Sequence, residues 1–386
     1  RINPQILTWA RESQGLALSE VAHKSLFRKI SLWETGQEFP TMRQVRDLAH
    51  FYKRPSALFF LKQPPAGGVV PVDFRSQKDQ AEYPLSAETI SDIRACESRR
   101  YAALELAEML EEPVRSRLPE LPADVDIEEY ADEITELLNV DYDRLSKIKS
   151  EKDALEYWIG RVELLNVLVF RSHTLNGWNT SFREVRGTSR YYEEFPWILL
   201  NSQEHPRGQL FTLGHELAHL LLHSGGVCTL DEHELNVHAE LERSCNRFSA
   251  ALLMPRDRVE AILNSVAYNL DDEDQLDLLI GRIQRVFHVS REAIARRLVS
   301  LGYIPWNGYF RIRQKQMEAL RVERDTSEGG GGGQYYYKRV LSWNGKKYTS
   351  LVTEAYQQNK ISLGEATGYL RTKVKHFESI HQELYG

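Results

Sequence analysis

The chain has 386 residues, of which 42% are hydrophobic and 27% are charged, and its formal net charge is −6. This length and composition predict two or three folded domains and exclude a disordered or fibrous protein. No apolar run approaches the roughly 20 residues of a membrane-spanning helix, and the first thirty positions hold no signal-peptide pattern. Because three widely spaced cysteines form no disulfide framework, we expect a cytoplasmic protein with no membrane association.

The N-terminal 62 residues predict a compact set of short helices. Ile6, Leu7 and Ala10 fall on one face of the first helix, and Ser19 is the expected N-cap of the second. This segment holds 10 basic and 5 acidic residues. Basic segments of this kind can contact nucleic acid.

The proline-rich and glycine-rich run QPPAGGVVPV at 63–72 cannot continue a helix and marks the first boundary. Apolar periodicity then predicts the following elements in chain order: helices over 86–112, 127–138 and 151–165, strands over 167–170 and 195–201, a further strand or hairpin between those strands, and helices again to about 302.

Five consecutive glycines at 329–333 predict a flexible tether. The residues after it predict three short helices and hold 8 basic against 4 acidic residues. We expect this tail to pack beside the N-terminal segment or a second copy of the chain, so that the two basic ends form one positive surface.

The strongest chemical signal is the sequence HELAH at 215–219. On a helix, His215 and His219 leave the same face and can bind one metal ion, while Glu216 lies beside them in the position of a general base. Thr212 is the expected N-cap of that helix. The pattern therefore predicts a catalytic zinc site.

A catalytic zinc ion needs a third protein ligand. Spacing alone leaves four candidates open, which are His233, His238, Glu240 and Glu242. His223 is eight residues after His215 and therefore points in a different direction from the helix axis. This position favours a helix-capping role, or a second-shell contact with a metal ligand, over contact with the oxyanion.

HELAH together with ELERSCNRFSAALLMP at 240–255 resembles the ImmA/IrrE family of metallopeptidases. The resemblance implies Glu242 as the third zinc ligand and Asn246 as a second-shell residue. Cys245 and Ser249 stand where the family usually has alanine. A small buried side chain is the favoured interpretation of Cys245, with metal contact as the alternative. The implied reaction is peptide hydrolysis at zinc.

The run WETGQEFPTMRQVRDLAHFY resembles the second half of an XRE-type helix-turn-helix domain. The resemblance implies a recognition helix that enters the major groove of DNA. The candidate DNA-binding residues are Lys24, Arg28, Lys29 and Ser31. The chain is about two residues shorter than the family before Trp33 and lacks the usual turn glycine, so a protein-docking helical domain is the alternative to DNA contact.

The order of these segments resembles a fused architecture of bacterial and phage regulators, and the resemblance covers most of the chain. The expected fold is multidomain and mainly α, with a zincin-like α+β core that contains a small sheet. The expected domains are an XRE-like domain at 1–62, a helical connecting region at 63–150, the peptidase core at 151–305, a linker at 306–333 and a small helical domain at 334–386.

Two functions are compatible with this organisation. The first is a regulatory zinc endopeptidase that cleaves a repressor-like protein or itself. The alternative is an antitoxin-like regulator that neutralises a toxin encoded beside it and represses its own promoter, with a non-catalytic or accessory zinc site. The expected partners are a protein substrate or a toxin, promoter DNA and a second copy of the chain.

Overall fold

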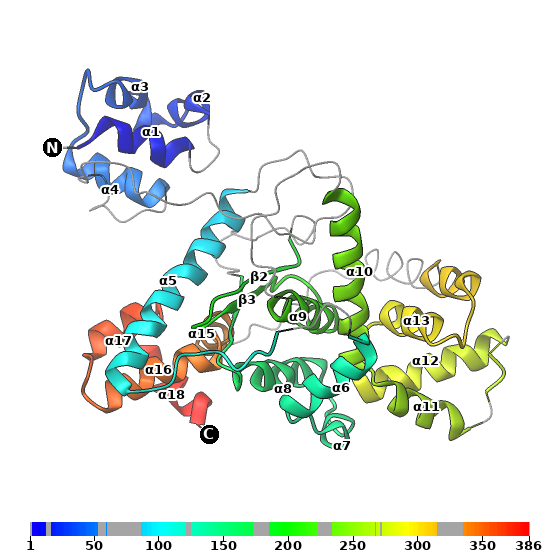
Figure 1. Cartoon of the computed structure of the whole chain (residues 1–386). Helices are drawn as coiled ribbons and strands as arrows, with labels where there is room; N and C mark the ends of the chain where they lie inside the picture. The colour runs from blue at the N-terminus through cyan, green and yellow to red at the C-terminus, as the bar shows by residue number, and fades with distance from the viewer. Residues whose placement is uncertain are drawn as a thin grey trace.

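The computed structural model is mainly helical and contains one three-stranded sheet (Figure 1). None of the helices in the described ranges is long and apolar enough to cross a membrane. The structure describes residues 2–12, 17–52, 59, 86–120, 125–172, 185–222, 234–266, 268–270, 272–314 and 335–385.

The first four helices enclose a small core of their own. They are α1 (Pro4–Glu12), α2 (Leu18–Ala22), α3 (Ile30–Glu34) and α4 (Met42–Phe51). Ile6, Leu7 and Ala10 are buried, as the periodicity of the first helix predicted. The expected N-cap was wrong, because α2 already begins at Leu18 and Ser19 lies inside it.

The expected recognition helix is broken. Ser25–Phe27 form a single 3-10 turn, and α3 contains only five residues. The candidate DNA-binding side chains are all exposed, but Lys24, Arg28 and Lys29 lie outside both helical segments and only Ser31 lies in α3. The helical run is interrupted at Arg28 and Lys29, which separate the 3-10 turn from α3.

The sheet consists of β1 (Leu168–Arg171), β2 (Gly187–Arg190) and β3 (Trp197–Leu200), with β3 in the centre. β3 pairs in parallel with β1 and antiparallel with β2. Alternate residues of a strand point to opposite faces, and both faces of this sheet are covered. The near-continuous apolar sequences of β1 and β3 follow from burial on both sides.

One face of the sheet belongs to the largest core of the molecule. Val169, Ile198 and Leu200 pack there with helices that precede and follow the sheet in the sequence. These helices are α6 (Ile127–Leu137), α7 (Tyr142–Leu145), α8 (Glu151–Glu163), α9 (Pro206–Leu221), α10 (Glu234–Leu253), α11 (Arg256–Asn264), α12 (Glu273–Phe287) and α13 (Arg291–Ser300). In the described residues, the helices and strands predicted between residues 86 and 302 are thus confirmed as element types.

The opposite face is covered by α5 (Ala87–Leu110) and by the C-terminal helices. Those are α15 (Tyr336–Asn344), α16 (Lys346–Gln357), α17 (Leu363–Tyr369) and α18 (Val374–Tyr385). Phe170, Trp197 and Leu199 are buried in this second core, and α16 packs along α5 (Figure 1).

The C-terminal tail is therefore placed differently from our expectation. Its buried side chains share a core with the sheet and α5, not with the N-terminal helices. The three helices predicted in the tail are confirmed as α16, α17 and α18, and α15 precedes them. Residues 306–314 of the expected linker are helical, and the polyglycine run lies outside the described residues. Our expectation was based on the basic charge of the two ends of the chain. The position of the tail instead depends on its apolar side chains, which pack on the sheet.

A buried arginine ties three helices of the largest core together. The side chain of Arg297 in α13 is 2% exposed and donates to both carboxylate oxygens of Glu128 in α6, at 2.5 and 2.6 Å. Its Nε also donates to the carbonyl of Met254 at the end of α10, at 2.9 Å. Removal of one partner leaves an uncompensated charge.

We expect Arg297→Ala to lower the free energy of unfolding by about 3–5 kcal/mol. Urea denaturation followed by circular dichroism measures this loss. Arg258→Ala is the matched control, because Arg258 pairs with Asp143 at 2.9 Å and both side chains are exposed, to 45% and 78%. The control should lose less than about 1 kcal/mol. Equal losses in the two variants would contradict the structural role of Arg297.

Glu163 connects the core to the C-terminal helices. Its buried carboxyl group accepts a hydrogen bond from the backbone N–H of Lys347 at 3.1 Å, in the first turn of α16. Burial raises the pKa of Glu163 to about 8, although Lys347 and the nearby charges of Lys346 and Arg171 act in the opposite direction. Glu156 adds to the increase.

Stability should therefore depend on the pH through Glu163. The folded state keeps this proton up to a pH of about 8, whereas an unfolded glutamate releases it near pH 4.3. The free energy of unfolding should fall as the pH rises through this window and then level off. Thermal unfolding at pH 5, 6.5 and 8.5 should show a shallower decrease for Glu163→Gln than for the wild type. If the unfolding temperature fell equally with pH in both proteins, the pH dependence could not come from Glu163.

Candidate metal centre

The HELAH sequence lies in the C-terminal half of α9, which begins six residues before Thr212. His205 is the N-cap and accepts a hydrogen bond from the backbone N–H of Arg207, and Pro206 occupies the first helical position. The expected capping role of Thr212 was therefore wrong. Its hydroxyl instead donates to Glu204 at 3.0 Å. The apolar run before HELAH is helical because proline at the first helical position favours helix initiation there.

Three side-chain atoms converge beside α9. The Nε2 atoms of His215 and His219 are 3.1 Å apart. The two carboxylate oxygens of Glu242 in α10 lie 3.3 Å from His215 Nε2 and 3.2 Å from His219 Nε2. Among the residues that the structure describes, these three form a group able to hold a metal ion.

The close approach of α9 and α10 brings Glu242 to the two histidines. A Cβ atom on Gly214 would lie 2.6 Å from Ser249 Oγ, so only glycine fits at this crossing. Ser249 also donates to the carbonyl of Phe211 at 2.8 Å. Two small residues therefore set the distance between the helices.

The donor set and its spacing fit a zinc ion. Two imidazole nitrogens and one carboxylate oxygen are typical ligands of a catalytic zinc, which keeps a fourth position open. With ligand bonds of about 2.0–2.2 Å, the edges of a coordination tetrahedron measure about 3.3–3.6 Å. The distance between the two Nε2 atoms, and the distance from each of them to its nearer carboxylate oxygen of Glu242, are close to these edges.

The shifted pKa values of Glu242 and His219 also favour the binding of a cation. Burial opposes ionisation of Glu242, yet hydrogen bonds with His215 and His219 hold the pKa of its carboxyl well below the usual range. Burial likewise disfavours a charged His219, but contacts with Cys245 and Glu242 raise the pKa of its imidazole well above the ordinary value. A divalent cation would satisfy the carboxylate in place of this proton, so metal binding should release a proton.

Glu216 faces the sheet beside the cluster. It is 3% exposed, and its Oε2 accepts a hydrogen bond from the hydroxyl of Ser189 in β2 at 2.8 Å. A Cβ atom on Gly187 would lie 2.4 Å from Thr212 Cγ2 and 3.3 Å from Glu216 Cγ, so glycine lets β2 approach α9. Sequence reasoning missed Ser189, because nothing in its local pattern marks it.

The neighbouring candidates occupy different positions. Cys245 is buried, and its Sγ lies 3.7 Å from His219 Nδ1, behind the ring and away from the converging Nε2 atoms. Asn246 donates to the backbone carbonyl of Glu242 at 2.7 Å. Glu240 is exposed. His223, His233 and the side chain of His238 lie outside the described part of the chain.

Comparison with known proteins finds a similarity over the part of the chain that contains the His-His-Glu cluster. The family model described as Peptidase_M78, the IrrE N-terminal-like domain, matches residues 163–299. This segment resembles an IrrE-type peptidase domain. It contains the sheet, both histidines and α10, whereas the N-terminal helices and α15 to α18 lie outside it.

A stretch of 96 residues is 34% identical to the radiation response metalloprotease IrrE of Deinococcus deserti. It covers 24% of this chain and 34% of that protein, so the chain spans about a third of the length of this curated relative. The chain is thus similar to part of a metalloprotease over a quarter of its length.

Proposed function

We propose that the chain is a regulatory zinc-dependent endopeptidase. The observation that carries this proposal is the convergence of His215, His219 and Glu242 beside a buried Glu216, within the segment that matches the Peptidase_M78 family model. A zinc ion held by these three residues would polarise a scissile carbonyl and make a water molecule more acidic.

The residues of the chain supply the proton transfers. Glu216 accepts the proton of the attacking water and returns it to the leaving amine. Ser189 holds the Glu216 carboxylate through its hydrogen bond. Such a base is not needed at a purely structural zinc site, so its presence supports catalysis over the antitoxin-like alternative.

Metal removal tests the proposal. The purified full-length protein is co-incubated with an extract of its host, and new protein N-termini are identified by chemical labelling and mass spectrometry. We expect cleavage products that disappear after dialysis against a chelator and return after one equivalent of zinc. A tightly bound partner without any cleavage product would instead favour the antitoxin-like function.

Promoter DNA is a further proposed partner of the basic N-terminal segment. The support is the exposure of Lys24, Arg28, Lys29 and Ser31. Because phosphate contacts release counterions, the double variant Lys24→Gln/Arg28→Gln should weaken binding to all DNA sequences and reduce the salt slope by about 2. Fluorescence anisotropy at several salt concentrations measures this slope. An unchanged slope would exclude phosphate contacts by these two residues.

A further inference from the structure

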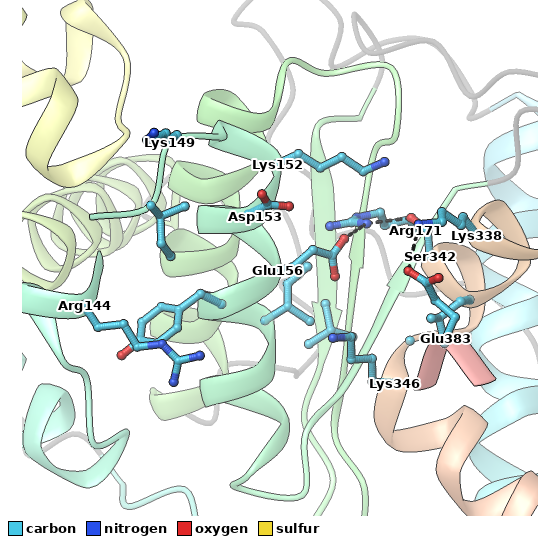
Figure 2. Close-up of a pocket in the computed structure, with 16 residues that line it drawn as sticks. Arg144, Lys149, Lys152, Asp153, Glu156, Arg171, Lys338, Ser342, Lys346 and Glu383 are labelled. Atoms are coloured by element: carbon cyan, nitrogen blue, oxygen red, sulfur yellow. Dashed lines mark hydrogen bonds and ion pairs between the residues drawn. The ribbon is translucent and has the colours of Figure 1, made fainter. Parts of the chain in front are cut away.

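A cleft of about 600 Å³ lies on the β1 side of the sheet, between α8 and α15. Figure 2 shows side chains from both helices directed toward it, with Arg171 of β1 between them. Its basic lining residues are Arg144, Lys149, Lys152, Arg171, Lys338 and Lys346. Its acidic lining residues are Asp153, Glu156 and Glu383.

Two of the three acidic side chains are already paired. Glu156 lies 2.7 Å from Arg171 Nη1, and Glu383 lies 3.0 Å from Lys338 Nζ. No ion pair within the described ranges involves Arg144, Lys149, Lys152 or Lys346, and all four are exposed. The cleft therefore carries an excess of positive charge that an anion would neutralise.

Arg171 supplies a second, independent indication of an anionic ligand. Its side chain is only 6% exposed. Nη1 donates to Glu156 and, at 2.6 Å, to Ser342 Oγ. Nε and Nη2 are buried and have no hydrogen-bond partner among the described residues.

The two unsatisfied nitrogens form one edge of the guanidinium plane. This edge binds carboxylate or phosphate oxygens through two parallel hydrogen bonds. Leaving buried donors unpaired is costly, so a ligand that provides acceptors here is stabilised. The side chain of Arg171 is thus held by Glu156 and Ser342, while its second edge has no hydrogen-bond partner among the described residues.

We propose that this cleft binds a small phosphate-bearing molecule. Several basic side chains around one guanidinium suit a polyanion better than a single carboxylate. The cleft is also larger than one phosphate group requires, and Ile148, Tyr157 and Leu341 offer apolar surface to the rest of the ligand. The site lies at β1, the opposite edge of the sheet from Ser189 and Glu216, so it does not depend on the proposed peptidase.

The test is calorimetric titration of the full-length protein at low salt with ATP, tripolyphosphate and adenosine. We expect saturable 1:1 binding of ATP and tripolyphosphate and none of adenosine. Arg171→Lys, which keeps the charge but loses the bidentate edge, should weaken binding at least tenfold. Repeating the titration with Glu242→Ala separates binding heat from metal chelation.

Because Arg171 is buried, Arg171→Lys could weaken binding simply by misfolding. Two double variants of exposed lysines, one inside and one outside the cleft, test the site without this problem. Lys149→Gln/Lys152→Gln should weaken binding at least tenfold, whereas Lys373→Gln/Lys375→Gln, exposed residues outside the cleft lining, should change it less than twofold. Equal weakening by both pairs, unsaturable binding or no binding would overturn the proposal. ATP binding at least tenfold tighter than tripolyphosphate would identify a nucleotide, and similar affinities would identify the phosphate chain alone.

Discussion

Replacing Glu216 by glutamine is expected to lower the rate of peptide cleavage by about 10²–10⁴-fold. The amide has nearly the same shape as the carboxylate but cannot take a proton from water. Because the three converging ligand atoms belong to other residues, the variant should keep its zinc. Rates of substrate cleavage measured at equal zinc content give this comparison directly.

Two further variants show whether the loss belongs to the proton transfer. Ser189→Ala removes only the hydrogen bond to Glu216 and should cause a smaller decrease, about tenfold. Glu240→Gln makes the same chemical change at an exposed position of α10 and should leave the rate unchanged. If Glu216→Gln cleaved as fast as Glu240→Gln, Glu216 could not be the general base.

Replacing Glu242 by alanine is expected to reduce zinc affinity at least a hundredfold, because a third of the protein ligands is lost. Competition with a chromophoric chelator measures the dissociation constant. Glu240→Ala is the matched control on the same helix, and its affinity should equal that of the wild type. A larger loss in Glu240→Ala than in Glu242→Ala would mean that the third ligand was assigned wrongly.

The metal cluster was predictable in part from spacing. The four-residue separation of His215 and His219 places both on one helical face wherever the helix begins, so the error about Thr212 did not matter. The proposed third ligand was harder to predict, because it comes from another helix and spacing left four candidates open. Only the resemblance pointed to Glu242, and the crossing of α9 and α10 at Gly214 brings it to the histidines.

In the fold, too, local features were predictable from the sequence and contacts between distant segments were not. Apolar periodicity predicted the helices and strands between residues 86 and 302, since burial of each element depends on its own pattern. The position of the C-terminal helices could not be predicted in this way. Their apolar faces fit the sheet surface formed by Phe170, Trp197 and Leu199, and nothing in the local sequence of the tail specifies that partner. Ser189 was missed because its partner Glu216 lies on a different element, and nothing in the local sequence of β2 specifies that contact.

The most direct test of the proposed zinc centre is anomalous X-ray diffraction from crystals of the full-length protein. Data are collected above and below the zinc absorption edge. We predict one anomalous peak per chain, present only above the edge, in contact with His215 Nε2, His219 Nε2 and the carboxylate of Glu242. A peak bound by other residues, or no zinc peak in protein grown with zinc, would contradict the proposed metal centre and with it the peptidase function.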